Sequence, residues 1–199
     1  MKWIVAWALC LLALALWHAS APVAAVDQAA AAWLGSLGAP WPQLAQLWDG
    51  LGKFAPTLAL AGVVAGWLVW RQRRRAAALV LGAVAGGWAL NGVMKLWIAR
   101  PRPAAATVTE VFGSSFPSGH AMGGTALWVA LALACLAGCR SNPARWAITV
   151  VTVVLVVLTA LSRPLLGVHY FSDVLAGVAG GLAWTLWLAR VCPPERTLG

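Results

Sequence analysis

Acidic side chains are scarce in this chain of 199 residues, which has only five aspartates and glutamates against 14 lysines and arginines. Charged residues of both signs make up 10% of the sequence, whereas a soluble domain carries roughly a quarter. Hydrophobic residues make up 62%, and several apolar runs approach the ~20 residues that cross a hydrocarbon core. The composition therefore excludes an ordinary soluble domain and indicates an integral membrane protein.

The few acidic residues and the four cysteines also limit metal chemistry. A two-metal site needs more carboxylates than this chain offers, so we expect no metal and no cofactor. Cys10, Cys135, Cys139 and Cys192 lie in apolar segments or at their ends. Cys135 and Cys139 are four residues apart, but a zinc site needs four ligands and no histidine or further cysteine lies nearby. We expect all four to be small buried apolar residues without disulfides.

The net charge of +9 raises the possibility of nucleic acid binding. However, the basic residues form short clusters between apolar runs, an arrangement that suits anionic lipid head groups and control of membrane topology. We therefore expect membrane lipids as partners and no nucleic acid, while the oligomeric state stays open.

The apolar runs predict an all-α, six-span membrane bundle that forms one domain over residues 1–199. The predicted spans are Trp3–Trp17, Phe54–Trp70, Ala76–Met94, Ser118–Gly138, Trp146–Leu161 and Val174–Ala189. The first run follows Lys2 and ends near Ala19-Ser20-Ala21, so it also resembles a signal peptide. We favour a retained helix, and cleavage of residues 1–21 stays an open alternative.

Residues 22–52 are less hydrophobic and contain two prolines. Leu44, Leu47, Trp48 and Leu51 follow a helical spacing, and Asp49 lies on another face with two glutamines. An amphipathic segment of this kind is expected to lie in the membrane interface between the first and second spans.

The basic residues predict the orientation. With six spans and an internal N-terminus, nine fall inside and five outside, as the positive-inside rule requires. The inner set is Lys2, Arg71, Arg73, Arg74, Arg75, Arg140, Arg145, Arg190 and Arg196. The outer set is Lys53, Lys95, Arg100, Arg102 and Arg163.

Three polar islands interrupt the apolar pattern: Lys95–Arg102, Pro117–His120 and Ser162–Asp173. Because successive spans alternate in direction, the end of the third, the start of the fourth, the end of the fifth and the start of the sixth share one side. The three islands are therefore expected to meet at the outer interface.

The island residues suit an anion. Lys95, Arg102 and Arg163 place three cations at one depth, where burying each charge costs roughly 2.5–3.5 kcal/mol. Arginine's planar fork matches phosphate oxygens, and a helix that starts at Ser118-Gly119 offers free amides to an anion. The alternatives are cations that only reach toward lipid phosphates and a helix cap that binds no ligand.

His169 and Asp173 are four residues apart, so a helical start to the sixth span would bring them together. A carboxylate that accepts one ring N–H fixes the histidine tautomer and frees the other nitrogen for chemistry. An ordinary interfacial histidine is the alternative for this pair alone. With His120 and three cations on the same side, a catalytic site becomes the better interpretation.

These residues resemble a family signature. Lys95-x6-Arg102-Pro103, Pro117-Ser118-Gly119-His120 and Ser162-Arg163-x5-His169-x3-Asp173 are similar to the three motifs of the type 2 phosphatidic acid phosphatase superfamily. That family contains membrane lipid phosphate phosphatases and, more distantly, vanadium-dependent haloperoxidases, which are mainly soluble and therefore disfavoured here. The resemblance covers about residues 76–190.

The resemblance implies a role for each motif residue. His169 would attack phosphorus to form a phosphohistidine, Asp173 would orient it, and His120 would protonate the leaving group and then activate water. The phosphoryl oxygens would be held by Lys95, Arg102, Ser118, the Gly119 amide and Arg163, without a metal. Arg100 and Glu110 lie outside the motifs and have no assigned role.

The resulting expectation is a lipid phosphatase at the outer face of a bacterial cytoplasmic membrane. Candidate substrates are undecaprenyl diphosphate, phosphatidylglycerophosphate and phosphatidate, the first favoured because the outer loop Leu96–Phe116 is short. A lipid phosphotransferase or lipid A phosphatase would use the same site. A transporter-like or structural helical bundle without enzymatic activity is the alternative from another class.

Overall fold

The computed structural model describes residue 17 and residues 20–103 and 113–195. Every regular element in these ranges is a helix, so the prediction of an all-α fold is confirmed. The elements are α2 (Ala21–Ser36), α3 (Trp41–Asp49), the 3₁₀ turn η1 (Gly50–Gly52), α4 (Phe54–Trp70), α5 (Arg74–Ile98), α6 (Gly119–Leu136), α7 (Asn142–Leu165) and α8 (Phe171–Val191).

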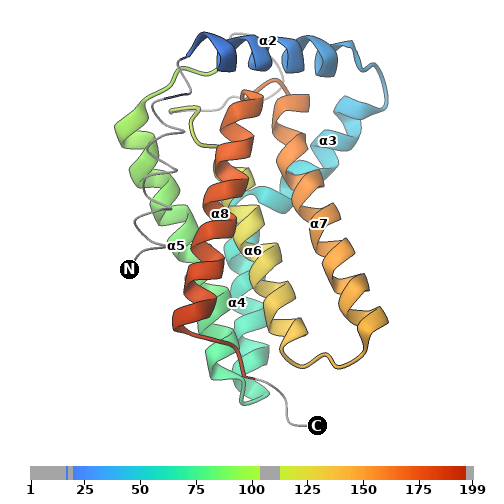
Figure 1. The fold of residues 1–199 in the computed structure, drawn as a ribbon, viewed down its shortest axis with the longest axis vertical. Helices are drawn as coiled ribbons and strands as arrows, with labels where there is room; N and C mark the ends of the chain where they lie inside the picture. The colour runs from blue at the N-terminus through green and yellow to red at the C-terminus, as the bar shows by residue number, and fades with distance from the viewer. Residues whose placement is uncertain (1–16, 18–19, 104–112, 196–199) are drawn as a thin grey trace.

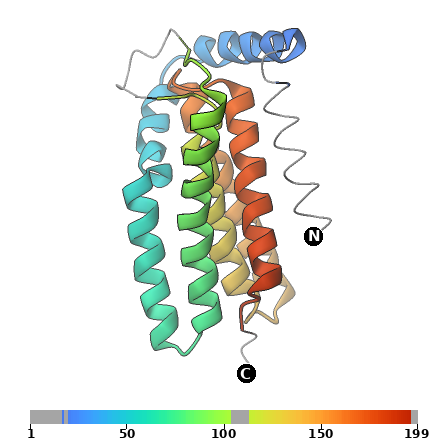
Figure 2. The same ribbon diagram turned by 90° about the vertical axis from the view of Figure 1, so that its left-hand side faces the viewer.

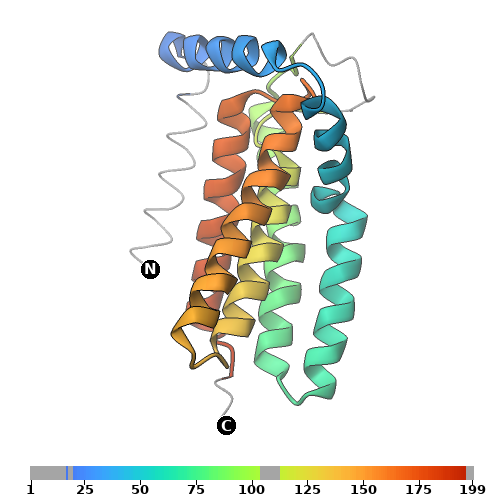
Figure 3. The same ribbon diagram turned by 90° about the vertical axis from the view of Figure 1, so that its right-hand side faces the viewer.

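The helices form an elongated bundle with one helix laid across its end. Helices α4 to α8 run roughly side by side, and α2 lies across them at one end (Figures 1, 2 and 3). Helix α6 is the most enclosed: 56% of its apolar span is buried, against 11% for α7. The valines of α7 therefore point away from the protein, as suits a helix that contacts lipid.

The span count is confirmed only in part. Helices α5, α6, α7 and α8 are each long and apolar enough to cross a membrane. The segment Trp41–Gly52 and α4 together pass the same test but are bent by 51°, which makes them a fifth, broken candidate. Of the predicted first span, only Trp17 lies among the described residues, so six spans remain a prediction.

Three helices, α5, α7 and α8, extend further than their apolar runs predicted. Helix α5 continues to Ile98 and α7 to Leu165, so Lys95 and Arg163 lie within the last turns of these helices. A charged residue ends an apolar run in the sequence, but it need not end a helix when its side chain has partners inside the bundle.

The amphipathic segment agrees with the prediction in α2 and departs from it in α3. Helix α2 lies across the bundle end, whereas α3 turns down along α7 (Figure 3). Leu47 is 74% exposed, and the buried residues of α3 are Ala45 and Asp49. Asp49 lies on another face than Leu47, as predicted, and that face packs into the protein, where the carboxylate has partners.

The prediction of buried cysteines was also wrong where it can be checked. Cys135 is exposed, while Cys139 and Cys192 are partly buried, and all three are free thiols. Cys10 lies outside the described residues. In a membrane bundle the surroundings of an outward helix face are apolar lipid, so a small apolar side chain need not be covered by protein.

Candidate active site

The eight predicted site residues lie at the end of the bundle that α2 covers. They come from the last turn of α5, the segment after it, the first turn of α6, the last turn of α7 and the connection into α8. In chain order they are Lys95, Arg102, Ser118, Gly119, His120, Arg163, His169 and Asp173. Lys95 is within electrostatic range of Arg102, Arg163 and Asp173, so two of the three islands act on one another.

The start of α8 places His169 against Asp173. Asp173 is the third residue of the helix, and its Oδ2 accepts the backbone N–H of Tyr170 at 3.0 Å, which caps the helix end. The same oxygen accepts the Ser115 hydroxyl and lies 3.3 Å from His169 Nδ1. The carboxylate that caps α8 therefore also orients the imidazole.

The tautomer of His169 follows from its two neighbours. Arg102 Nη1 lies 3.2 Å from His169 Nε2, and a guanidinium can only donate, so Nε2 is the acceptor and Nδ1 carries the proton toward Asp173. Burial lowers the pKa of His169 to about 4, although the hydrogen bond and charge of Asp173 act in the opposite direction. At neutral pH the imidazole is thus neutral, with a lone pair on Nε2.

Lys95 and Arg102 bind the carbonyl groups of neighbouring loops. Arg102 donates to Gly113 O at 3.1 Å and to Val168 O at 2.9 Å, and Lys95 donates to Ser114 O. Burial and the nearby Arg163 charge lower the pKa of Arg102, although a guanidinium stays protonated. Carbonyl oxygens carry no net charge, so the local potential remains positive and favours an anion.

Close packing between α6 and α8 sets the position of the α6 N-terminus. Ser118 caps α6 through its side chain, and its backbone N–H donates to Asp173 O at 3.0 Å. A Cβ on Gly177 of α8 would lie 2.6 Å from Ser118 O. Only glycine allows this approach, which brings the first turn of α6 beside the first turn of α8.

His120 and Arg163 share a carboxylate on α3. Asp49 Oδ1 pairs with Arg163 Nη1 and lies 3.4 Å from His120 Nε2, while Asp49 Oδ2 lies 3.0 Å from Lys53 Nζ. The His120 contact is an ion-pair distance without hydrogen-bond geometry, and Nε2 is buried with no hydrogen-bond partner among the described residues. It is therefore available to a ligand.

Sequence reasoning missed four polar residues of this cluster: Asp27, Asp49, Arg100 and Ser115. Arg100 donates to Asp173 Oδ1 at 2.5 Å and to Asp27 Oδ2 at 2.8 Å. Asp27 and Asp49 are 3% and 5% exposed, so three of the five acidic residues of the chain are buried here. The scarcity of acidic residues in the sequence was the signal that could have pointed to Asp27 and Asp49, because a carboxylate in an apolar segment needs a partner.

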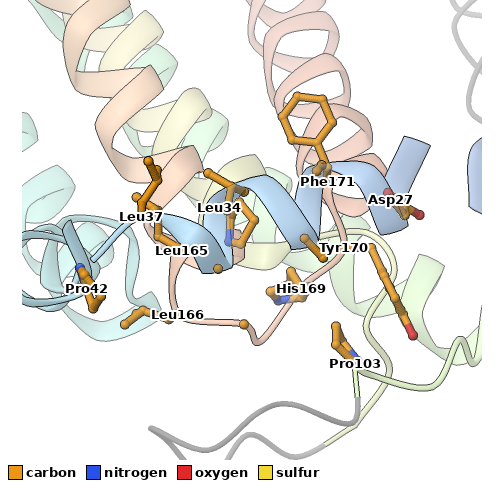
Figure 4. Close-up of a pocket in the computed structure, with 15 residues that line it drawn as sticks. Asp27, Leu34, Leu37, Pro42, Pro103, Leu165, Leu166, His169, Tyr170 and Phe171 are labelled. Carbon is orange, nitrogen blue, oxygen red and sulfur yellow. The ribbon is translucent and has the colours of Figure 1, made fainter. Parts of the chain in front are cut away.

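A pocket of about 320 Å³ opens beside His169 beneath α2 (Figure 4). Figure 4 shows His169 near its centre, with Leu166 and Pro42 on one side and Pro103 on the other. The lining is mainly alanine, leucine and proline, and Asp27, His169 and Tyr170 supply its polar side chains. Apolar walls with a few polar groups are typical of a ligand site.

The described part of the chain contains no obvious set of metal ligands. Across residues 20–103 and 113–195, no three His, Cys, Asp or Glu side chains gather in a way that could hold a metal ion.

Fold and site together define a multi-pass membrane protein with two histidines and several cations gathered at one end of its helical bundle. The sequence profile of the PAP2 superfamily matches residues 75–196, and the chain belongs to that superfamily. The chain is 35% identical to phosphatidylglycerophosphatase B of Bacillus subtilis (strain 168) over 94 residues, which are 47% of this chain and 46% of that protein. The matched part is thus about half of the relative's length.

A solved structure agrees over nearly the whole chain. The structure described as the first transmembrane PAP2-type phosphatidylglycerolphosphate phosphatase from Bacillus subtilis superposes with a TM-score of 0.82. Sequence identity is 28%, and the match covers 96% of both chains. The family resemblance and the transmembrane helical fold predicted from the sequence are confirmed.

Proposed function

We propose that this chain is a lipid phosphatase that hydrolyses phosphate monoester or diphosphate lipids through a phosphohistidine at His169. The observation that carries the proposal is the state of His169: a buried neutral imidazole with Nδ1–H toward Asp173 and the Nε2 lone pair toward the Arg102 guanidinium. A phosphate drawn to Arg102 would meet the lone pair of the nucleophile. The PAP2 membership and the names of the two relatives support this class of reaction.

The first step transfers the phosphoryl group to the enzyme. His169 Nε2 attacks phosphorus, the bond from phosphorus to the lipid oxygen breaks, and His120 gives its proton to the departing oxygen. In the second step His120 takes a proton from water, the oxygen of that water attacks phosphorus, and the P–N bond breaks to release phosphate. Fixed cations and helix amides stabilise the charge on the equatorial oxygens, which is the main need of phosphoryl transfer.

His120 has the surroundings that these proton transfers need. Asp49 lies 3.4 Å from Nε2, and the lack of a hydrogen bond leaves the nitrogen free to approach the leaving oxygen. Lys95, Arg163 and the Ser118-Gly119 helix start would complete the phosphate site.

The pocket beside His169 supports a lipid as the phosphate ester. Its mostly apolar walls would hold the part of the substrate next to the phosphate by contacts of low specificity. The short outer loop favoured undecaprenyl diphosphate, but the names of the relatives make phosphatidylglycerophosphate our first candidate.

We expect the purified protein to release phosphate from several lipids in detergent. Because apolar contacts discriminate weakly, kcat/KM for phosphatidylglycerophosphate, phosphatidate and undecaprenyl diphosphate should agree within about two orders of magnitude, or roughly 3 kcal/mol. Glucose 6-phosphate, which lacks chains and does not concentrate in micelles, should be far poorer. Phosphate release measured for the four compounds in one detergent tests the proposal.

Two controls make this assay decisive. Activity should persist in EDTA and be inhibited by vanadate, which imitates the five-coordinate phosphoryl group. Loss of activity in EDTA with recovery in magnesium would refute the metal-free scheme. Equal hydrolysis of glucose 6-phosphate would refute lipid recognition, and absence of phosphate release from every lipid would refute the function itself.

We also propose that the site faces the outer side of the cytoplasmic membrane, since the arginine-rich turn after α4 lies at the opposite end of the bundle. Gln28 on α2 and Gln72 in that turn are both exposed and offer a matched pair of positions. In a variant without native cysteines, Gln28→Cys should react with an impermeant maleimide in intact cells, and Gln72→Cys only after permeabilisation. The reverse pattern would invert the proposed topology.

A further inference from the structure

A buried ionic cluster outside the three motifs joins α2 to the catalytic carboxylate. Arg100 Nη1 donates to Asp173 Oδ1 at 2.5 Å, and its Nη2 donates to Asp27 Oδ2 at 2.8 Å. All three side chains are enclosed, with 10% of Arg100, 2% of Asp27 and none of Asp173 exposed. One guanidinium therefore bridges two carboxylates, and one of them also holds His169.

The cluster is held from several sides. Asp27 accepts the backbone N–H of Ser172 at 2.8 Å and its hydroxyl at 2.7 Å, and Arg100 Nη1 also donates to Ser172 Oγ. The Arg100 guanidinium lies 4.0 Å from the centre of the Tyr170 ring. These contacts fix the guanidinium beside the first turn of α8, where Asp173 must present Oδ2 to His169.

The positive charge of Arg100 explains why a second carboxylate, that of Asp27, is needed beside it. An arginine paired with Asp173 alone would draw the carboxylate's negative charge away from the His169 Nδ1–H and weaken its hold on the imidazole. A second carboxylate on the same guanidinium offsets part of that charge. Asp173 can then be fixed by Arg100 through Oδ1 while Oδ2 stays an effective acceptor.

We propose that Asp27 and Arg100 are positioning residues for the His169–Asp173 pair: Arg100 orients the Asp173 carboxylate, and Asp27 offsets the Arg100 charge so that His169 stays an effective nucleophile. This inference rests on the proposed phosphatase reaction at His169. Helix α2 is in this way part of the catalytic apparatus, although it lies outside the region matched by the family profile.

Asp27→Asn tests the proposal, because asparagine keeps one oxygen as an acceptor for the Ser172 backbone N–H and removes the charge, together with the acceptor of the Arg100 Nη2 hydrogen bond. We expect kcat to fall about tenfold to a hundredfold with KM within about threefold, since the phosphate-binding cations are untouched. Asp27→Glu should recover part of the loss. Gln28→Ala, at the next and exposed position of α2, is the matched control and should keep wild-type kcat.

The pKa of His169 is a second readout. It distinguishes a positioning role of Asp27 from a purely structural role in holding α2 on the bundle. The chain has three histidines, so the His169 ring can be assigned and titrated by NMR in detergent. The charged groups that act on it directly are Asp173 of α8, Arg102, Arg163 of α7 and His120 of α6, and Arg100 acts on it through Asp173. In Asp27→Asn the uncompensated Arg100 charge should keep the pKa of His169 at or below about 4, whereas release of α2 would admit water and raise it toward 6.5.

The kcat of the variant and the pKa of its His169 together decide between the two explanations. Reduced kcat with an unraised pKa supports positioning, whereas kcat within about twofold of wild type, or reduced kcat with a raised pKa, overturns it. If Asp27→Asn fails to fold, Arg100→Lys gives the same comparison, because an ammonium cannot hold both carboxylates in a fork. An inactive wild-type protein would refute the proposed function, and the titration would still test whether Asp27 controls His169.

Discussion

Replacing His169 with alanine should abolish phosphate release, lowering kcat by at least about 10⁴-fold, because no other group near phosphorus can form the covalent intermediate. The effect exceeds the ~10²–10⁴ expected for loss of a general acid or base. His169 is almost fully enclosed, and Arg102 and Asp173 hold its two ring nitrogens, so the imidazole is fixed in the orientation that attack requires. Lipid phosphate hydrolysis by His169→Ala in detergent is the measurement.

His120→Ala is the matched variant that separates the two histidines. An ester with a good leaving group needs no proton donor, so this variant should still form the phosphoenzyme and then accumulate it, because water activation is lost. Alkaline quenching preserves phosphohistidine, and a radiolabelled aryl phosphate makes it visible. Phosphoenzyme in His169→Ala, or its absence in His120→Ala, would contradict the assignment of roles.

The helical bundle could be predicted from the sequence because a bilayer restricts which backbone structures can cross it. Apolar runs of this length can only be helices in a membrane, and alternating direction brings their ends together in a known order. The start and end of α4 were predicted to the residue, whereas α7 continues past its apolar run to Leu165. Its last turn is polar on the side that faces the site, and hydropathy does not distinguish such a turn from a loop.

The motif residues were visible in the sequence because their spacing is local, as with His169 and Asp173. Their partners were not, because Asp49 is 114 residues from Arg163 in the chain and Asp27 is 145 residues from Ser172. Helical periodicity placed Asp49 on a polar face, but a polar face can turn toward water or toward a buried arginine. That choice depends on tertiary packing, here on the bend of 51° after α3.

The Asp49–Arg163 ion pair is expected to give the largest effects outside the histidines. Both side chains are buried, and the carboxylate is the anion that Arg163 contacts in this structure. Breaking a buried pair by neutralising one partner costs on the order of 3–5 kcal/mol. We expect Asp49→Asn to lower the thermal unfolding midpoint in detergent by several degrees, by roughly 2–4 °C per kcal/mol for a chain of this size.

A bound anion should reverse this loss. Vanadate at the site would supply the countercharge that Asp49 no longer gives, so it should bind Asp49→Asn more tightly than the wild-type protein, by about tenfold for each 1.4 kcal/mol of the lost pairing. Its stabilising effect on the variant should be correspondingly larger. Asp27→Asn is the control: it removes an equally buried acid, but Arg100 keeps its contact with Asp173, and vanadate affinity should not rise.

The double variant Asp49→Val/Arg163→Leu separates stability from function. Replacing a buried ion pair with well-packed hydrophobic side chains of similar volume is often neutral or stabilising, so we expect the unfolding midpoint to recover toward that of the wild-type protein. Vanadate binding and turnover should not recover, because the cation itself is gone. Arg163 would then serve to bind phosphate through its positive charge. Asp49 would pair with that charge when no substrate is bound. A double variant as unstable as Asp49→Asn, or one that still binds vanadate tightly, would contradict this account.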